Sequence, residues 1–296
     1  MEKENKFLLF FGDSREEKDL CLIKTKRKFD NESVPFDLLK RFEEISRLTE
    51  LEDKSKEFYA EIKNKPEGYL GKSHKILKLE ILLYALAGAK ELLIDIPKNR
   101  KESYIDFINL IRPIGQTVLK AAQNKKRVGV SVKDNDDLKL ETILMRLGFP
   151  IALGDWGGQG LKLEKEDIDI LFEKEFLEVT LDTSSREKIY SFFMQKEKGS
   201  LPARVKKAAN IYPIIHTDEN LKEVLFSIVN CSFDDREFLP LECAILKEGK
   251  WKIERLFEQG DWKSSPRLLT YEDGMPILKI YVKSWSAEFV KATKIQ

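Results

Sequence analysis

Two residue types that carry much of enzyme and metal chemistry are scarce in this chain of 296 residues. The sequence contains 2 histidines, His74 and His216, and 3 cysteines, Cys21, Cys231 and Cys243. Because no two cysteines have the Cys-x-x-Cys spacing, they form neither a zinc motif nor a disulfide framework. We expect them to be small core residues in a reducing compartment, and we expect no metal site and no cofactor.

The sequence also lacks long hydrophobic runs and an excess of one charge. A membrane-spanning helix needs about 20 apolar residues, whereas the most apolar stretch, 76–93, is interrupted by two lysines and two glutamates. The apolar run 7–11 is too short for the core of a secretion signal. Lys+Arg is 52 and Asp+Glu is 51, so no overall field attracts nucleic acid or anionic lipid. We therefore expect a cytoplasmic protein with no membrane span and no nucleic-acid partner.

The remaining composition is typical of a soluble globular protein, with 42% hydrophobic and 35% charged residues. The length suits two domains. Strand-like runs alternate with helical periodicity over residues 1–182, which predicts an α/β sensory or interaction domain. A GAF-like module and a small doubly wound sheet both fit this alternation. Three helices are expected, over 36–63, 74–93 and 104–122, the last kinked or split at Pro113.

The pattern changes from mixed to all-β near residue 200. A helix over 186–198, capped by Ser184 or Ser185, is expected to lie in a linker spanning 183–199. Short apolar or alternating runs separated by turn residues then predict a β domain over 200–296. The six expected strands are 209–216, 221–229, 238–246, 251–257, 267–271 and 276–282. The predicted fold class is therefore α+β, with an N-terminal α/β domain followed by a small six-stranded β-barrel.

A short basic segment and a strand end carry the sequence's candidate binding residues. Arg204, Lys206 and Lys207 lie just before a strand-like run, and Asn230-Cys231-Ser232 ends the next such run. A guanidinium can hold a phosphate or a guanine edge through paired hydrogen bonds. A short amide and a hydroxyl can complete the contacts to the polar edge of a base.

This order of motifs resembles PilZ domains, which are small β-barrels that bind cyclic di-GMP. Those domains carry Arg-x-x-x-Arg before the first strand and Asp/Asn-x-Ser-x-x-Gly 20 to 30 residues later. Here Ser200 or Ala208 replaces one arginine, depending on the register, and Asp235 stands in place of the glycine. The resemblance implies a signalling protein without catalytic activity whose partner is cyclic di-GMP or a related cyclic dinucleotide. The ligand-binding residues that it implies are Arg204, Lys206, Lys207, Asn230 and Ser232.

The sequence leaves two alternatives open. The first is a PilZ-like structural or dimerisation module without ligand, in which the N-terminal domain contacts a second copy or a protein partner. The second is a hydrolase, because Phe11-Gly12-Asp13-Ser14 resembles the nucleophile block of GDS-type serine hydrolases. That family needs a histidine in an Asp-x-x-His motif, and neither histidine of this chain has the aspartate.

Tryptophans supply the remaining candidates in the β domain. Trp251, Trp262 and Trp285 are expected to lie in the core or to line a groove, where one of them could stack on a ligand ring.

Overall fold

A computed structural model divides the chain into two compact units. The first unit comprises Met1–Gln123 with Leu256–Trp262, and the second comprises Asn124–Arg255 with Lys263–Gln296. The described residues are 6–10, 20–23, 34–51, 57–62, 73–95, 101–132, 141, 144–152, 160–164, 166–167, 183–195, 201–206 and 210–295. The domain boundaries expected at 182 and 199 stay a prediction.

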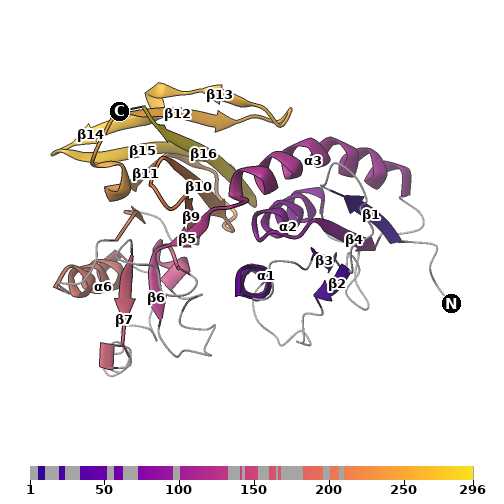
Figure 1. Cartoon of the computed structure of the whole chain (residues 1–296), viewed down its shortest axis with the longest axis horizontal. Coiled ribbons are helices and arrows are strands. Elements are labelled where there is room, and N and C mark those ends of the chain that lie inside the picture. The colour runs from indigo at the N-terminus through magenta and orange to yellow at the C-terminus, as the bar shows by residue number, and fades with distance from the viewer. Residues whose placement is uncertain are drawn as a thin grey trace. The chain divides into compact units, whose positions relative to one another are not determined.

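The described residues of the first unit form a four-stranded sheet and three helices (Figure 1). Its strands and helices are, in chain order, β1 (Lys6–Phe10), β2 (Leu20–Ile23), α1 (Val34–Leu51), β3 (Glu57–Ile62), α2 (His74–Leu86), β4 (Glu91–Asp95) and α3 (Lys101–Ala122). The sheet order is β1-β4-β3-β2. Strands β2, β3 and β4 run parallel, with α1 and α2 as the crossovers, and β1 pairs antiparallel with β4.

The helices of this unit follow from capping and apolar composition. Ser73 caps α2, because its hydroxyl accepts a hydrogen bond from the backbone N–H of Ile76 at 3.4 Å. Most of α2 is buried, which fits its nearly continuous apolar sequence. Helix α3 continues through Pro113, so the split expected there does not occur. Gly260 packs on this point of the helix: a Cβ at Gly260 would lie 2.8 Å from the carbonyl oxygen of Pro113.

The second unit consists mainly of antiparallel strands. Its first elements are β5 (Lys126–Val128), β6 (Val130–Val132), β7 (Leu161–Leu163) and α6 (Thr183–Gln195). The remaining elements are β8 (Arg204–Val205), β9 (Ile211–Thr217), β10 (Glu223–Asn230), β11 (Arg236–Glu242), η2 (Ala244–Leu246), β12 (Trp251–Leu256), β13 (Trp262–Ser264), η3 (Pro266–Leu268), β14 (Leu269–Glu272), β15 (Met275–Val282) and β16 (Ser286–Lys294). They form a six-stranded sheet, β13-β12-β16-β10-β9-β5, and a four-stranded sheet, β14-β15-β11-β8.

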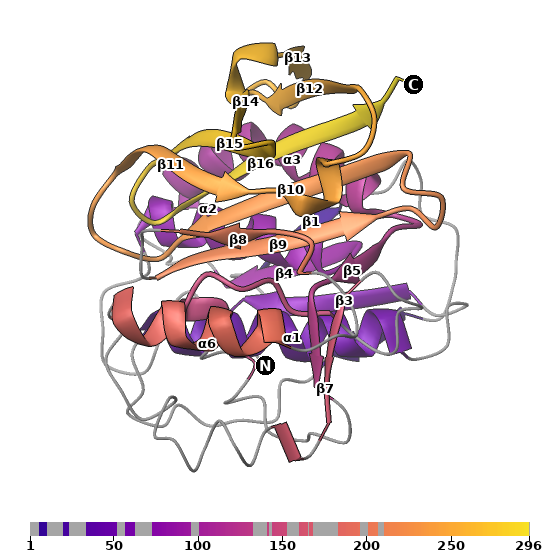
Figure 2. The same ribbon diagram turned by 90° about the vertical axis from the view of Figure 1, so that its left-hand side faces the viewer.

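These two sheets share one hydrophobic core, as expected for a β-sandwich (Figure 2). The six-stranded sheet contributes alternate residues such as Val224, Phe226 and Ile228, and the four-stranded sheet contributes residues such as Leu241 and Ile280. Among the described strands, none of one sheet pairs with the other. The predicted fold class, with a closed six-stranded barrel, is therefore wrong: the strands split into two open sheets.

A tight backbone crossing separates β5 from β6. A Cβ at Gly129 would lie 2.2 Å from the carbonyl oxygen of Pro150, and a Cβ at Gly160 would lie 2.3 Å from the carbonyl oxygen of Gly129. Three chain segments meet here, and backbone hydrogen bonds of 2.8 to 3.0 Å join them. Beyond Gly129 the chain leaves the six-stranded sheet, and β6 pairs parallel with β7.

None of the helices in the described part of the chain is long and apolar enough to cross a membrane.

Candidate functional site

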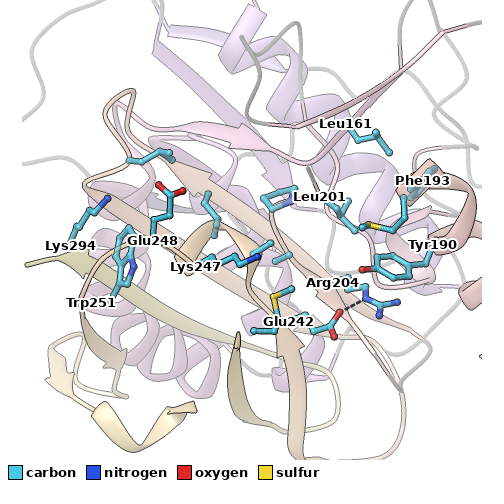
Figure 3. A pocket seen from close by; sticks show the side chains of 17 residues that line it. Leu161, Tyr190, Phe193, Leu201, Arg204, Glu242, Lys247, Glu248, Trp251 and Lys294 are labelled. Atoms are coloured by element: carbon cyan, nitrogen blue, oxygen red, sulfur yellow. Dashed lines mark hydrogen bonds and ion pairs between the residues drawn. The ribbon is translucent and has the colours of Figure 1, made fainter. Parts of the chain in front are cut away.

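A pocket of about 490 Å³ lies within the second unit. Its walls come from α6, the segment leading into β8, the end of β11, and the turn that joins η2 to β12 (Figure 3). The side chains that matter for its chemistry are Tyr190, Arg204, Glu242, Lys247, Glu248, Trp251 and Lys294. Its volume is within the range of about 300–1,000 Å³ that is usual for small-molecule sites.

Strand pairing places a charged pair at one end of the pocket. Arg204 on β8 faces Glu242 on β11 across the antiparallel ladder, and its Nε donates a hydrogen bond to a carboxylate oxygen of Glu242. Lys206 contacts the other carboxylate oxygen of Glu242, with its Nζ at 2.7 Å. Glu242 is thus held between two cations, and its side chain is 12% exposed.

The environment of Glu242 keeps its carboxylate ionised. Burial by itself would raise the pKa of Glu242, but the hydrogen bonds and charges of Arg204 and Lys206 outweigh burial and lower the pKa below its usual value. A carboxylate in this state accepts hydrogen bonds from ligand hydroxyls, and it is poorly suited to donate a proton at neutral pH.

An aromatic ring and a cation lie together at each end of the pocket. The guanidinium carbon of Arg204 is 3.2 Å from the ring centroid of Tyr190, and Arg204 also pairs with Glu187 at 3.3 Å. On the opposite side, Lys294 faces Trp251 across β16 and β12, and its Nζ lies 5.7 Å from the centre of the Trp251 ring. Figure 3 shows these two pairs on opposite sides of the pocket. Each pair combines a flat apolar surface with positive charge.

The structure brings together two of the predicted ligand-binding residues, Arg204 and Lys206, at Glu242. Of the five predicted residues, Arg204 lines the pocket. Lys207 lies outside the described residues.

Asn230 and Ser232 lie at a different place, where β10 of the other sheet ends. Asn230 is fully buried, and its Nδ2 donates to the carbonyl oxygens of Asp234 at 2.9 Å and Val282 at 3.3 Å. Its Oδ1 accepts from the backbone N–H of Ser232 at 2.8 Å and lies 2.7 Å from the Ser232 hydroxyl. The polar groups of these two residues are engaged within the turn, and they do not converge with Arg204 on one cleft.

The surroundings of the two histidines indicate structural roles. His74 begins α2 and stacks on Phe107, with ring centroids 4.5 Å apart and an interplanar angle of 10°. His216 on β9 is buried, and burial, with Arg127 and Lys125 as further causes, lowers its pKa to about 3. His216 is therefore neutral at pH 7. Ser14 of the predicted hydrolase motif lies outside the described residues.

Sequence reasoning missed Tyr190, Glu242 and Lys294 as pocket residues. Trp251 was among the tryptophans expected in a core or groove, and it lines this pocket. The sequence does not mark Glu242 and Lys294 as site residues, because their roles depend on which residues lie opposite them on the paired strands. Within the described residues, no group of three or more His, Cys, Asp or Glu side chains is placed to hold a metal ion.

Comparisons with known proteins show similarity in the fold and not in the sequence. No protein-family model and no curated protein matches the chain. An α-L-fucosidase (isoenzyme 2) from Paenibacillus thiaminolyticus superposes over 82% of this chain with a TM-score of 0.51 and 7% identity. A rhamnosidase from Novosphingobium sp. PP1Y gives a TM-score of 0.47 over 93% of this chain, at 10% identity. A GH27 β-L-arabinopyranosidase from Geobacillus stearothermophilus, in complex with arabinose, gives 0.43 over 88%, at 8% identity.

Of these three structures, the fucosidase has the TM-score that indicates a shared fold, and at 7% identity the likeness concerns the fold alone. The chain spans 61% of the length of the fucosidase, 34% of the rhamnosidase and 43% of the arabinopyranosidase.

These findings correct the predicted function. The expectation of a cyclic di-GMP receptor without catalytic activity is wrong, and so is the expected cyclic dinucleotide partner. The closed barrel required by that interpretation is absent from the described strands, and the structure reported above with a TM-score over 0.5 is an α-L-fucosidase.

Proposed function

We propose that the pocket of the second unit binds a carbohydrate. The observation that carries this proposal is the arrangement of Tyr190 and Trp251 on opposite sides of one cavity that also contains Glu242. The fold likeness to an α-L-fucosidase supports the same class of ligand.

The chemistry of the pocket suits a sugar ring. A pyranose has apolar C–H faces, which pack on aromatic rings, and hydroxyl groups, which need both donors and acceptors. Trp251 and Tyr190 provide the aromatic surfaces, and the ionised Glu242 provides acceptors. Lys247 and Lys294 provide donors. The ion pairs of Glu242 with Arg204 and Lys206 hold its carboxylate in place before a ligand arrives, which lowers the entropic cost of binding.

Saturation-transfer NMR and calorimetry with a panel of monosaccharides, including L-fucose, test this proposal. We expect one or more sugars to bind the wild-type protein and Trp251→Ala to weaken that binding about tenfold or more. Trp262→Ala is the matched control, because Trp262 lies on the neighbouring strand β13 and outside the pocket lining. Absence of binding across the panel, or equal losses in the two variants, would refute a carbohydrate site here.

Hydrolysis of a glycosidic bond is a second candidate function, favoured by one observation. Two carboxylates, Glu242 and Glu248, line the same pocket. Most glycoside hydrolases use a pair of carboxyl groups, one ionised and one that donates a proton. The ionised Glu242 suits the nucleophile or charge-stabilising role, and Glu248 is the second carboxyl group of the pair.

Turnover of 4-nitrophenyl glycosides, including the α-L-fucoside, tests this second candidate. We expect Glu242→Gln and Glu248→Gln each to lower kcat by about 100-fold or more. Glu272→Gln, which changes an exposed carboxylate on β14, is the control. Melting temperatures measured in parallel separate lost chemistry from lost folding. If the wild type hydrolyses none of the substrates, or if both pocket variants retain full turnover, the hydrolase candidate is wrong.

The proposed location is the cytoplasm. Cys231 and Cys243 are buried free thiols, as expected for a protein kept in a reducing compartment. Fractionation of cells that express the full chain checks this, and recovery in the extracellular fraction would contradict it.

A further inference from the structure

One side of the pocket in the second unit is apolar, and α6 supplies much of it. Tyr190, Phe193 and Met194 occupy positions i, i+3 and i+4 of this helix, so their side chains share one helical face, and all three line the pocket. Leu161 on β7 and Leu201, in the segment before β8, also line it. We call Leu161, Phe193, Met194 and Leu201 the apolar wall.

The apolar wall lies apart from the charged groups around Trp251. Figure 3 shows Leu161, Phe193 and Leu201 on the side of the pocket that carries Tyr190, away from Trp251. The pocket therefore has two parts of different chemistry. One part offers hydrophobic side chains, and the other offers an indole ring with charged neighbours.

Packing and backbone hydrogen bonds hold the apolar wall in place. Phe193 is 2% exposed, and its ring meets the ring of Phe149 edge-to-face with centroids 5.2 Å apart. The segment that carries Leu201 is tied to η2, because the backbone N–H of Ile245 donates to the carbonyl oxygen of Pro202 at 2.9 Å. The wall is thus formed before any ligand binds, which lowers the cost of binding.

Met194 leaves apolar surface in contact with water at the edge of this wall. It is 61% exposed, although it lines the pocket. Covering such a side chain with an apolar group is favourable, because apolar surface is removed from water. A methionine side chain has three rotatable bonds and a polarisable sulfur, so it adapts to ligand groups of different shape.

The pocket has enough hydrogen-bonding side chains for one sugar ring and not for two. Its five charged side chains are Arg204, Glu242, Lys247, Glu248 and Lys294, and the first two already bond to one another. A second sugar ring on the apolar wall would place its hydroxyl groups against leucine and phenylalanine side chains, which offer no partner. Burying a hydroxyl without a hydrogen bond is costly.

The volume of the pocket nevertheless requires more than a single sugar. A cavity of about 490 Å³ is of the size that holds a drug-sized molecule, which is larger than one pyranose ring. A ligand that fills the pocket therefore has a second group beside the sugar. The apolar wall makes that second group apolar.

We infer that the ligand of this pocket is a glycoside whose aglycone, the part that is not sugar, is an apolar alkyl or aryl group. The sugar lies between Trp251 and Glu242, and the aglycone lies on the apolar wall. This inference rests on the proposed carbohydrate site and names the class of ligand for it.

Calorimetry of the full chain with matched glycosides tests the inference. The ligands are the methyl, phenyl and octyl glycosides of D-glucose, D-galactose and L-fucose, each below its micelle concentration. Cellobiose and lactose are the disaccharides, and n-octanol is the probe without sugar. For at least one sugar, we expect the octyl or phenyl glycoside to bind at least about tenfold more tightly than the methyl glycoside, since burial of about two methylene groups gives a factor of this size. The disaccharides should gain nothing over the methyl glycoside.

Variants of Met194 connect the gain in affinity to the apolar wall. Met194→Gln keeps the length of the side chain and makes it polar, and it should weaken the octyl glycoside about fivefold while leaving the methyl glycoside unchanged. Met194→Leu should retain the affinity of the wild type. Leu110→Gln is the control, because Leu110 is a 70% exposed apolar residue of α3 outside the pocket lining. Since Met194 is exposed, its variants should fold, and melting temperatures check this.

The outcomes separate this inference from the proposed function. If methyl and octyl glycosides bind equally, or if a disaccharide gains as much as the octyl glycoside, the carbohydrate site stands and the apolar aglycone is wrong. The aglycone is also wrong if Met194→Gln and Leu110→Gln have equal effects on the octyl glycoside. If n-octanol binds as tightly as the octyl glycosides and no methyl glycoside binds, the pocket takes apolar molecules without sugar, and the carbohydrate site fails as well. Absence of binding by every ligand refutes both.

Discussion

Arg204 and Glu242 face one another across strands β8 and β11, and the guanidinium donates from Nε to the carboxylate. This pair lies at one end of the pocket, where the Tyr190 ring covers the guanidinium. A short edge strand thereby places an anion, a cation and an aromatic face within one site. Such a site has its charges arranged before a ligand binds.

Glu242→Gln should destabilise the protein at neutral pH by about 1–3 kcal/mol, because Arg204 and Lys206 lose their ionised partner. The folded pKa of Glu242 lies below its unfolded value, so its contribution is present above the unfolded pKa of about 4.3. This contribution is lost as the pH falls through the folded pKa. The difference in unfolding free energy between wild type and variant should therefore shrink below about pH 4. Urea unfolding at pH 7, 5 and 3 measures it, and a difference that does not depend on pH would contradict the prediction.

His216 should make stability fall as the pH decreases through the unfolded pKa of histidine. Burial, followed by the charges of Arg127 and Lys125, lowers its folded pKa to about 3, whereas the unfolded chain takes up a proton below about pH 6.5. Between these values the unfolded state binds more protons, so stability rises with pH, by up to about 1.4 kcal/mol per pH unit. His216→Gln should remove this slope between pH 6 and 4. The exposed His74→Gln is the control, and an unchanged slope in His216→Gln would refute the assignment.

Gly129→Ala should prevent normal folding or cost more than about 3 kcal/mol, because its Cβ would lie 2.2 Å from the carbonyl oxygen of Pro150. Gly274→Ala is the informative comparison, since no atom lies within 4 Å of its Cβ and its φ of 77° is the source of strain. That variant should cost about 1 kcal/mol. Circular dichroism and thermal unfolding measure both. Similar, small losses of stability in the two variants would mean that the chain segments at Gly129 and Pro150 are packed less closely than the structure shows.

Phe226→Ala should cost about 3–5 kcal/mol, because Phe226 is fully buried between the two sheets of the sandwich. Phe238→Ala removes the same side chain from an exposed position and should change stability by less than about 0.5 kcal/mol. Chemical unfolding of the two variants gives the comparison. Equal losses of stability in the two variants would show that Phe226 does not belong to the core of the second unit.

Within the described residues the sequence predicts several helices and strands correctly, but the helix expected over 36–63 ends at Leu51 and is followed by β3, Glu57–Ile62. Periodicity places helices near α2 and α3, and the observed elements span His74–Leu86 and Lys101–Ala122. Alternation and turn residues place strands near β9, β10 and β12, which the structure confirms as Ile211–Thr217, Glu223–Asn230 and Trp251–Leu256. These elements depend on local spacing of apolar residues, which is visible in one dimension.

The same reasoning does not predict the longest described strand of the second unit. Strand β16, Ser286–Lys294, begins with Ser-Ala-Glu and ends with Lys-Ala-Thr-Lys, so its apolar content is low. It nevertheless lies inside the six-stranded sheet, between β10 and β12. Its polar residues gain partners there, because Lys291 pairs with Glu254 at 3.2 Å and Glu288 pairs with Arg255. A charged strand is therefore stable in a central position when its neighbours are complementary, and the sequence does not show which strands those are.

Composition and local patterning by themselves determined that this chain alternates strands and helices first and then becomes rich in β-strands, because apolar periodicity and turn residues act over a few positions. Only the tertiary structure decided that the described strands after residue 200 form two open sheets and not a barrel, that Asn230 serves a turn, and that Glu242 faces Arg204. The physical reason is that strand partners are chosen by burial and cross-strand complementarity between residues far apart in the chain.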